Sequence, residues 1–300
     1  MSYRDQEREK IVKIRDSLFK DSGRGIFSGK ERDFVLSDPL NNLWPGIRDD
    51  AIDYFKRNRI SWWKSKNKPC GHLLSSQIAC INHLYSLRQR EDLATSVLRS
   101  INRNIKRACV VDDGFVEFEI VGKKNYLGER HHTRGVNSTS VDALMAGEQY
   151  NGQHILIFIE WKYTESYEGE SLAIERRLRT YQKFLEREDG SIHCENIEDL
   201  FFEPFYQLMR QTLLAWSMVR AKEYGATDWL HLHIIPEQNK ELRDRNTSPG
   251  LKGKDMSSAW KSILKEPQRY LVISPEEFLK SATRCVDTLS LINYLNKRYW

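Results

Sequence analysis

The chain has 300 residues, of which 40% are hydrophobic and 30% charged, and its formal net charge at pH 7 is +5. This length suits one large α/β domain, or a core domain with added helices, and excludes any need for a disulfide framework. The five cysteines are scattered and odd in number, so we expect reduced thiols in a cytoplasmic protein. The charged N-terminus is unlike a signal peptide, and no apolar run approaches transmembrane length, so we expect no membrane contact.

The N-terminal part of the chain is predicted to be a helical extension. Apolar side chains at helical spacing predict one helix over residues 4–20 and another over residues 47–57. Residues 56–68 then carry six basic side chains, no acid, and the adjacent pair Trp62 and Trp63. This segment fits a nucleic-acid contact, with charges for phosphates and rings for exposed bases. It fits equally well a solvated loop in which one tryptophan is anchored in the core.

The middle of the chain is predicted to follow the order helix–strand–strand–strand–helix–strand. The expected elements are a helix over 73–89, strands over 115–120, 138–145 and 154–163, a polar helix over 171–187, a long helix over 203–224 and a strand over 226–235. The strand over 154–163 is strongly apolar and β-branched, which is typical of a buried central strand. We therefore expect an α/β fold with a mixed central sheet flanked by helices.

The C-terminal part is predicted to add to this core. Residues 238–254 are typical of an exposed, mobile loop, and the last forty residues are expected to be helical. The resulting division is an N-terminal helical extension and basic loop over 1–69, a core over 70–240, and a loop and helical region over 241–300.

Two strands of this core carry charged residues in a pattern that indicates a metal site. Asp142 lies on the second strand, while Glu160 and Lys162 lie near the end of the third. Because strand side chains alternate, Glu160 and Lys162 point to one face and Trp161 points to the other. If the two strands pair, Asp142 approaches Glu160, and two carboxylates in one site repel each other unless a cation or proton compensates them.

A hard divalent cation fits this pattern. Mg²⁺ takes oxygen ligands and keeps several waters, which leaves room for a phosphate oxygen and an attacking water. Asp142 and Glu160 are the expected ligands, and the backbone carbonyl of Trp161 is a further candidate. The Lys162 ammonium can orient or help deprotonate the water, or neutralise charge that develops at phosphorus. The alternative for Glu160 and Lys162 alone is an exposed ion pair at a strand end.

The same residues carry a family resemblance. STSVD ending in Asp142, seventeen further residues, and the Glu-x-Lys of IEWK resemble the PD-(D/E)XK nuclease superfamily, whose αβββαβ core matches the predicted element order. The motifs HLLSSQIACIN, RGVNSTSVDALM, IEWKYTESY and FYQLMRQTLLA together resemble a little-studied bacterial restriction-endonuclease-like group, over roughly residues 62–236. The resemblance implies Asp142 and Glu160 as metal ligands and Lys162 as the catalytic lysine. Val141 stands where the nominal motif has proline.

Five further residues are candidates for substrate binding or for support of the site. The resemblance implies a role for Gln207, one turn before Gln211 on the same helix face, and Gln77 is the nearest equivalent of a glutamate that some members use as a ligand. Arg134 precedes the Asp142 strand and is a candidate phosphate clamp. Glu119 could add a carboxylate to the same face, although its alternation with Glu117 favours a solvated strand face.

Two histidine patterns have simpler explanations. The spacing of Cys70, His72, Cys80 and His83 matches no zinc module, and Cys80 falls on an apolar helix face, so zinc is disfavoured there. His231 and His233 alternate on the fourth strand. We interpret them as strand histidines with ordinary hydrogen-bond partners rather than as residues that line the site.

The sequence therefore predicts a Mg²⁺- or Mn²⁺-dependent nuclease that hydrolyses phosphodiester bonds. DNA is favoured over RNA as the substrate, endonuclease action is favoured, and a homodimer is possible. The alternative is a nucleic-acid-binding module, a defence or repair accessory that keeps the nuclease scaffold with little turnover.

Overall fold

A computed structural model describes residues 1–65, 67–134 and 138–300. The helices are α1 (Tyr3–Phe19), α2 (Arg48–Arg57), α3 (Ser76–Leu84), α4 (Glu91–Ile101), α5 (Glu175–Leu185), α6 (Phe205–Arg220), α7 (Lys240–Arg243), α8 (Met256–Lys261), α9 (Pro275–Leu279) and α10 (Leu289–Arg298). The strands are β1 (Gly25–Phe27), β2 (Lys30–Arg32), β3 (Ile105–Cys109), β4 (Glu117–Ile120), β5 (Val141–Gln149), β6 (His154–Trp161), β7 (Ala226–Ile234) and β8 (Tyr270–Ile273). Position 66 of the basic segment and positions 135–137 of the RGVNSTSVDALM motif lie outside the described residues.

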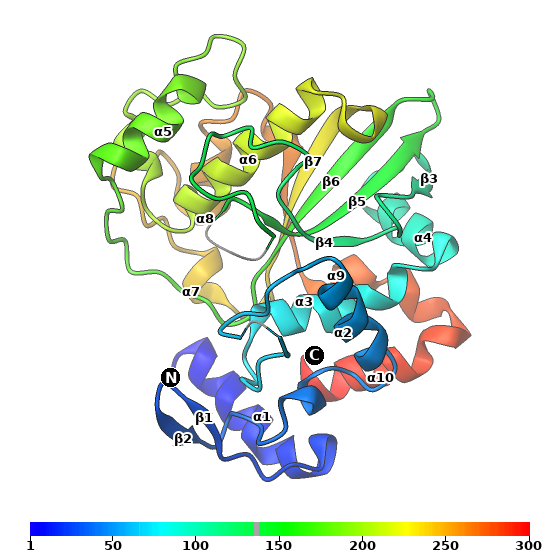
Figure 1. Ribbon diagram of the computed structural model, residues 1–300. Helices are drawn as coiled ribbons and strands as arrows, with labels where there is room; N and C mark the ends of the chain where they lie inside the picture. Colours follow the sequence, from blue (N-terminus) through cyan, green and yellow to red (C-terminus); the bar gives the residue numbers. More distant parts are fainter. Residues whose placement is uncertain (66, 135–137) are drawn as a thin grey trace.

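Six strands form one mixed sheet in the order β3-β5-β6-β7-β8, and β4 pairs with the first half of β5. β5 and β6 are antiparallel neighbours, whereas β6, β7 and β8 run parallel. The parallel step from β6 to β7 needs a crossover, and the chain makes it through α5 and α6. The predicted mixed sheet flanked by helices is confirmed (Figure 1).

The sheet is larger than the sequence pattern indicated. Strand β3 was not predicted, because its exposed middle residues Lys106 and Arg107 interrupt the apolar pattern. The helical prediction for the last forty residues is wrong at β8, a four-residue edge strand that is too short to show a period. The expected mobile loop is also ordered in part, since Leu242 of α7 and Leu251 are buried.

The two faces of the sheet pack against different helices. On one face, Leu144, Leu156 and Phe158 pack in a core with α6. On the other face, Met145 and Ile157 pack in a second core with α3 and α4. This is the alternation expected of strands buried on both faces, and it explains why β6 is apolar along nearly its whole length.

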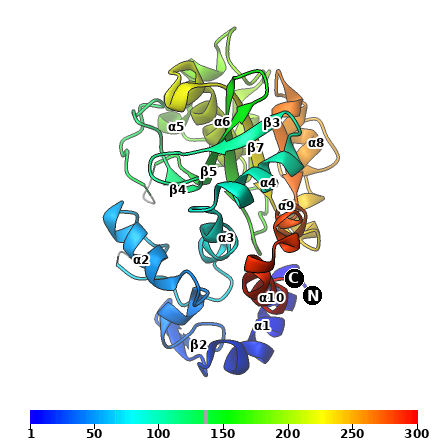
Figure 2. The same cartoon turned by 90° about the vertical axis from the view of Figure 1, so that its right-hand side faces the viewer.

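The two ends of the chain meet on the α3 side of the sheet. α1 and α10 lie side by side in both views (Figures 1 and 2). Lys10 Nζ donates to the carbonyl of Tyr299 at 3.1 Å, and the Tyr163 hydroxyl donates to Glu7 Oε2 at 2.6 Å. One core cluster therefore includes residues of all three predicted segments, and the boundaries at residues 69/70 and 240/241 stay a prediction. Among the described residues, no helix is both long and apolar enough to cross a lipid bilayer.

Several histidines are buried in this fold, which predicts a loss of stability in acid. Burial lowers the pKa of His83 to about 3, with Arg298 adding to the effect, and burial lowers the pKa of His231 to about 3. Between those values and the unfolded pKa of about 6.5, the unfolded chain binds more protons than the native one. The stabilisation is complete above about pH 6.5 and is lost as pH falls toward the folded pKa, at about 1.4 kcal/mol per pH unit for each histidine.

Urea unfolding at pH 7, 6 and 5 checks this expectation. His83→Gln should reduce the dependence of the unfolding free energy on pH, because it removes one titrating group. His193→Gln is the matched control, since His193 is exposed. Equal pH dependence in His83→Gln and the wild type would contradict the expectation.

Candidate active site

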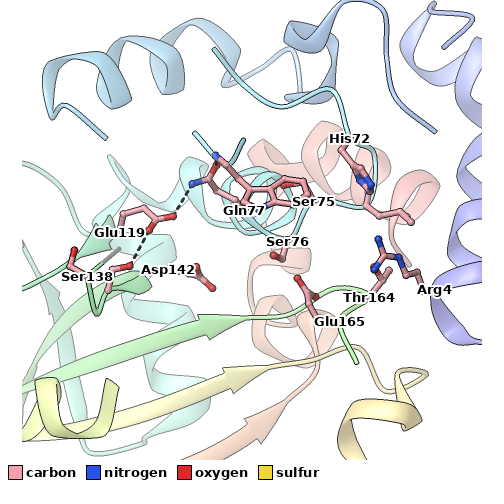
Figure 3. A pocket seen from close by; sticks show the side chains of 13 residues that line it. Arg4, His72, Ser75, Ser76, Gln77, Glu119, Ser138, Asp142, Thr164 and Glu165 are labelled. Atoms are coloured by element: carbon pink, nitrogen blue, oxygen red, sulfur yellow. Dashed lines mark hydrogen bonds between the residues drawn. The ribbon is translucent and has the colours of Figure 1, made fainter. Parts of the chain in front are cut away.

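A cleft of about 450 Å³ opens where α3, the paired strands β4 and β5, and the segment after β6 come together. Its lining includes Asp142, Glu119 and Gln77 at one end, and Glu165 and Arg4 at the other (Figure 3). The cleft thus lies between the sheet and the N-terminal α1, which supplies Arg4. Of the predicted site residues, Asp142, Glu119 and Gln77 are the ones that line the cleft.

Asp142 is the second residue of β5, at the end of the strand nearest the carboxyl end of β6. It directly precedes Ala143, which pairs with Ile159, so it lies beside the residues that end β6. Its Oδ2 accepts a hydrogen bond of 2.7 Å from the backbone N–H of Trp161. The backbone of β6 therefore holds Asp142 next to Glu160.

Glu160 and Lys162 form a buried ion pair behind Asp142. Lys162 Nζ lies 2.6 Å from Glu160 Oε1, and the two residues are only 6% and 2% exposed. The predicted alternative, an exposed pair at a strand end, is therefore wrong. Trp161 points to the opposite face, where its ring packs on His83. Its carbonyl as a metal ligand stays a prediction.

Helix α6 supplies partners to both members of this pair. Gln207 Oε1 accepts a 2.6 Å hydrogen bond from Lys162 Nζ. Gln211 Nε2 donates to Glu160 Oε2 and, at 3.0 Å, to the carbonyl of Ser140. The two glutamines are one turn apart, as expected, and they hold the charged pair against the sheet.

Glu119 brings a third carboxylate to the cleft. Its Oε1 accepts a 2.8 Å hydrogen bond from Gln77 Nε2 of α3, and its Oε2 accepts one of 3.2 Å from the Ser140 hydroxyl. Glu119 has a positive φ of 53°, so β4 departs from simple alternation at this residue.

The favoured interpretation of a solvated face for Glu117 and Glu119 is wrong. Glu117 is fully buried and pairs with Arg88 and with the Tyr54 hydroxyl at 2.6 Å, while Glu119 is 8% exposed. The alternating acids could not reveal this, because the residues that cover them come from distant segments.

Burial and mutual repulsion dominate the electrostatics of the site. Burial raises the pKa of Asp142 well above its usual range, and the charges of Glu160 and Glu119 raise it further. Burial likewise raises the pKa of Glu119. For Lys162 burial works in the opposite direction, but attraction to Glu160 and neighbouring groups prevails and raises its pKa well above the usual value. The buried Lys162 thus lies beside the buried Glu160, and the half-buried Asp142 adds a second carboxylate at the edge of the cleft.

This donor set fits a hard divalent cation. Its donors are oxygens, mainly of carboxylates, and Asp142 uses one of its two oxygens within the protein. Gln211 Oε1 is buried beside Glu160 without a hydrogen-bond partner among the described residues. The three carboxylates are not all within 4.8 Å of one another. In the described part of the chain, the group that meets this criterion is Cys109, Glu148 and His154, at the far end of the sheet.

Arg134 does not line the cleft. Its Nε donates to the carbonyl of Phe118 at 3.0 Å, and a second guanidinium nitrogen donates to the Tyr54 hydroxyl at 2.7 Å. Its nearest acid is Glu117, at 3.6 Å. The arginine therefore stabilises the surroundings of the buried Glu117. Its role as a phosphate clamp stays a prediction.

The histidines occupy separate surroundings. His72 packs against Phe27 and lines the cleft, whereas His83 packs on Trp161 at the other side of α3. The sites around Cys70 and Cys80 are therefore not one metal site. His231 and His233 are buried in β7, with nearest polar partners Thr212 and Tyr270 respectively.

Several residues that line the cleft were not predicted from the sequence, and three of them carry polar or charged groups that matter to the site. Ser140 hydrogen-bonds Glu119, Glu165 accepts a 2.7 Å hydrogen bond from the backbone of Tyr163, and Arg4 enters from α1. Ser140 and Glu165 lie inside the motifs RGVNSTSVDALM and IEWKYTESY, which is a signal that could have found them. Arg4 has no such signal, because only folding brings α1 to the cleft.

Comparison with known proteins places the chain in a family. No curated protein and no solved structure matches the chain. The family described as "Restriction Endonuclease associating with ARP" matches residues 17–300, which include all the strands and the acid-lysine cluster. The match spans almost the whole chain, so the protein belongs to this restriction-endonuclease family.

Proposed function

We propose that the chain is a metal-dependent nuclease of the PD-(D/E)XK type, which hydrolyses phosphodiester bonds of nucleic acid, with DNA favoured. The observation that carries the proposal is the buried Glu160–Lys162 pair with two further carboxylates, the half-buried Asp142 and the buried Glu119, at the edge of an open cleft. The restriction-endonuclease family supports the same class of reaction.

The cluster has little purpose as a purely structural feature. Burial of several carboxylates together is unfavourable, and the raised pKa of Asp142 reflects that cost. A divalent cation would offset the repulsion, and Asp142 and Glu160 are the residues that would hold it. Glu119 lies close enough to repel Asp142 electrostatically, which makes it a candidate to hold a water of the ion. Mg²⁺ or Mn²⁺, when bound, would polarise a phosphoryl oxygen and supply an activated water.

Lys162 is assigned to charge stabilisation in this proposal. Glu160 and Gln207 fix its ammonium on two sides at 2.6 Å each. A lysine held as a cation in this way is suited to neutralise charge that develops at phosphorus and to orient the attacking water. Gln211 orients Glu160 from α6. Gln77 orients Glu119 from α3.

A cleavage assay tests the proposal directly. The purified protein is incubated with supercoiled plasmid, linear duplex, single-stranded DNA and RNA, each with Mg²⁺, Mn²⁺, Ca²⁺ or EDTA. We expect cleavage with Mg²⁺ or Mn²⁺ and none with EDTA. Asp142→Asn and Lys162→Ala should be inactive under every condition.

Two outcomes would count against the proposal. No cleavage of any substrate, together with metal-independent binding of nucleic acid, would favour a binding module on a nuclease scaffold. Cleavage by both variants at the wild-type rate would show that the activity resides elsewhere.

A further inference from the structure

The two adjacent tryptophans of the basic segment have opposite surroundings. Trp62 is 4% exposed, and its ring stacks on Phe55 with centroids 3.9 Å apart. Trp63 is 40% exposed and lines the cleft that contains Asp142. Trp62 thus anchors the segment, while an indole ring is left open to solvent beside the acid cluster.

Hydrogen bonds connect Trp63 to the acids. Its backbone N–H donates to Gln77 Oε1 at 2.8 Å, and the amide nitrogen of the same Gln77 donates to Glu119 at 2.8 Å. Figure 3 shows the Gln77 side chain and its hydrogen bond to Glu119. The backbone position of Trp63 is therefore coupled to the Glu119 carboxylate through one side chain.

Trp63 also belongs to a small aromatic wall. Phe27 of the β1–β2 hairpin lies 5.8 Å from its ring centroid, and His72 lies 5.6 Å away. Phe27 and His72 are themselves 4.8 Å apart. These three rings separate the cleft from a second cavity, because Phe27 lines that cavity while Trp63 and His72 line the cleft.

The second cavity is lined by basic side chains, whereas the end of the cleft beside Trp63 is lined by acids. Its volume is about 710 Å³, and its charged lining residues are Arg24, Lys64 and Lys68, with no acid among the described residues that line it. All three side chains are exposed. A strand of nucleic acid that passes from this cavity to the cleft would meet three cations, then the aromatic wall, then the acids.

We infer that Trp63 stacks an unpaired base next to the reacting phosphate, while Arg24, Lys64 and Lys68 bind the phosphates of the same strand. This rests on the proposed nuclease function and names its substrate class as single-stranded, or locally unpaired, nucleic acid. The reason is geometric: an indole ring can stack only on a base whose face is exposed, and bases within a duplex are covered by their neighbours. Cations alone bind the backbone of either form.

Binding measured without divalent metal tests the inference apart from catalysis. Fluorescence anisotropy in EDTA compares a labelled 12-nucleotide single strand with its duplex, for the wild type and Trp63→Ala. Stacking of one base on an aromatic ring predicts that Trp63→Ala weakens single-strand binding about 5- to 100-fold and leaves duplex binding unchanged. Trp63→Phe should restore part of the loss, because it keeps an aromatic face.

Matched controls separate stacking from charge. Tyr150→Ala removes an aromatic ring that is 65% exposed at the other end of the sheet, and it should change nothing. Lys68→Gln should weaken binding of both forms and reduce the dependence of log K on log salt by about one. A single strand that carries abasic sites should bind wild type and Trp63→Ala equally. Melting temperatures of all variants establish that they are folded.

Equal single-strand affinities of Trp63→Ala and the wild type would overturn the inference, as would failure of the wild type to bind the single strand. Cleavage of single-stranded DNA at the same rate by the wild type and Trp63→Ala would also overturn it, while the nuclease proposal would stand. Conversely, a protein that never cleaves but loses single-strand binding in Trp63→Ala would support the site and contradict the nuclease.

Discussion

Asp142→Asn is expected to abolish metal-dependent cleavage and, without metal, to make the protein more stable. Asparagine keeps an oxygen that can accept the N–H of Trp161, so the contact with β6 is retained. It removes a carboxylate whose pKa is raised by burial and by the charges of Glu160 and Glu119. Each unit by which burial raises the pKa of an acid costs about 1.4 kcal/mol of stability at neutral pH. We therefore expect the unfolding free energy to rise.

The loss of activity should be large. A bound metal contributes several kcal/mol of charge stabilisation in the transition state, and about 1.4 kcal/mol corresponds to tenfold in rate. Cleavage should therefore fall by at least about 10³-fold in Asp142→Asn.

Thermal unfolding with and without Mn²⁺ checks both halves of this prediction. The wild type should gain stability from Mn²⁺, because a ligand that binds only the folded state stabilises it, whereas Asp142→Asn should gain little. Asp244→Asn is the control, since Asp244 is exposed and lies outside the lining of the cleft. A less stable Asp142→Asn protein in EDTA would contradict the electrostatic account of the site.

Lys162→Met is expected to lower both activity and stability. The substitution leaves Glu160 buried without its cation, and removal of one partner of a buried ion pair costs about 3–5 kcal/mol. It also removes the ammonium that donates a hydrogen bond to Gln207 Oε1. The double variant Glu160→Gln/Lys162→Met removes both charges, so most of the stability should return while activity stays absent.

Urea unfolding of the wild type, Glu160→Gln, Lys162→Met and the double variant measures the coupling energy between the two charged side chains. Lys106→Met provides the control, because Lys106 is half exposed where it pairs with Glu148, and exposed pairs contribute at most about 1 kcal/mol. If the double variant is as unstable as Lys162→Met alone, the ion pair is not the source of the loss.

The relation of Asp142 to Glu160 and Lys162 could be predicted because it depends on local rules. Side chains alternate along a strand, and consecutive strands joined by a short turn pair antiparallel, so the spacing alone brings these residues to one place. The α/β class followed from the same periodicities. The helix period placed Gln207 and Gln211 on one face, and the family resemblance implied that this face lies at the site.

Everything that depends on distant segments was decided by the tertiary structure. Adjacent tryptophans of equal hydrophobicity carry no signal to say that Trp62 stacks on Phe55 while Trp63 faces the cleft. The burial of Glu117 needs Tyr54 and Arg88, which approach only when α2 and the segment after α3 fold over β4. The sequence by itself determined which charged groups share a strand end. Only packing between segments far apart in the chain determined which of them are buried, which are paired and which face open space, because desolvation and charge pairing depend on neighbours that the local pattern does not contain.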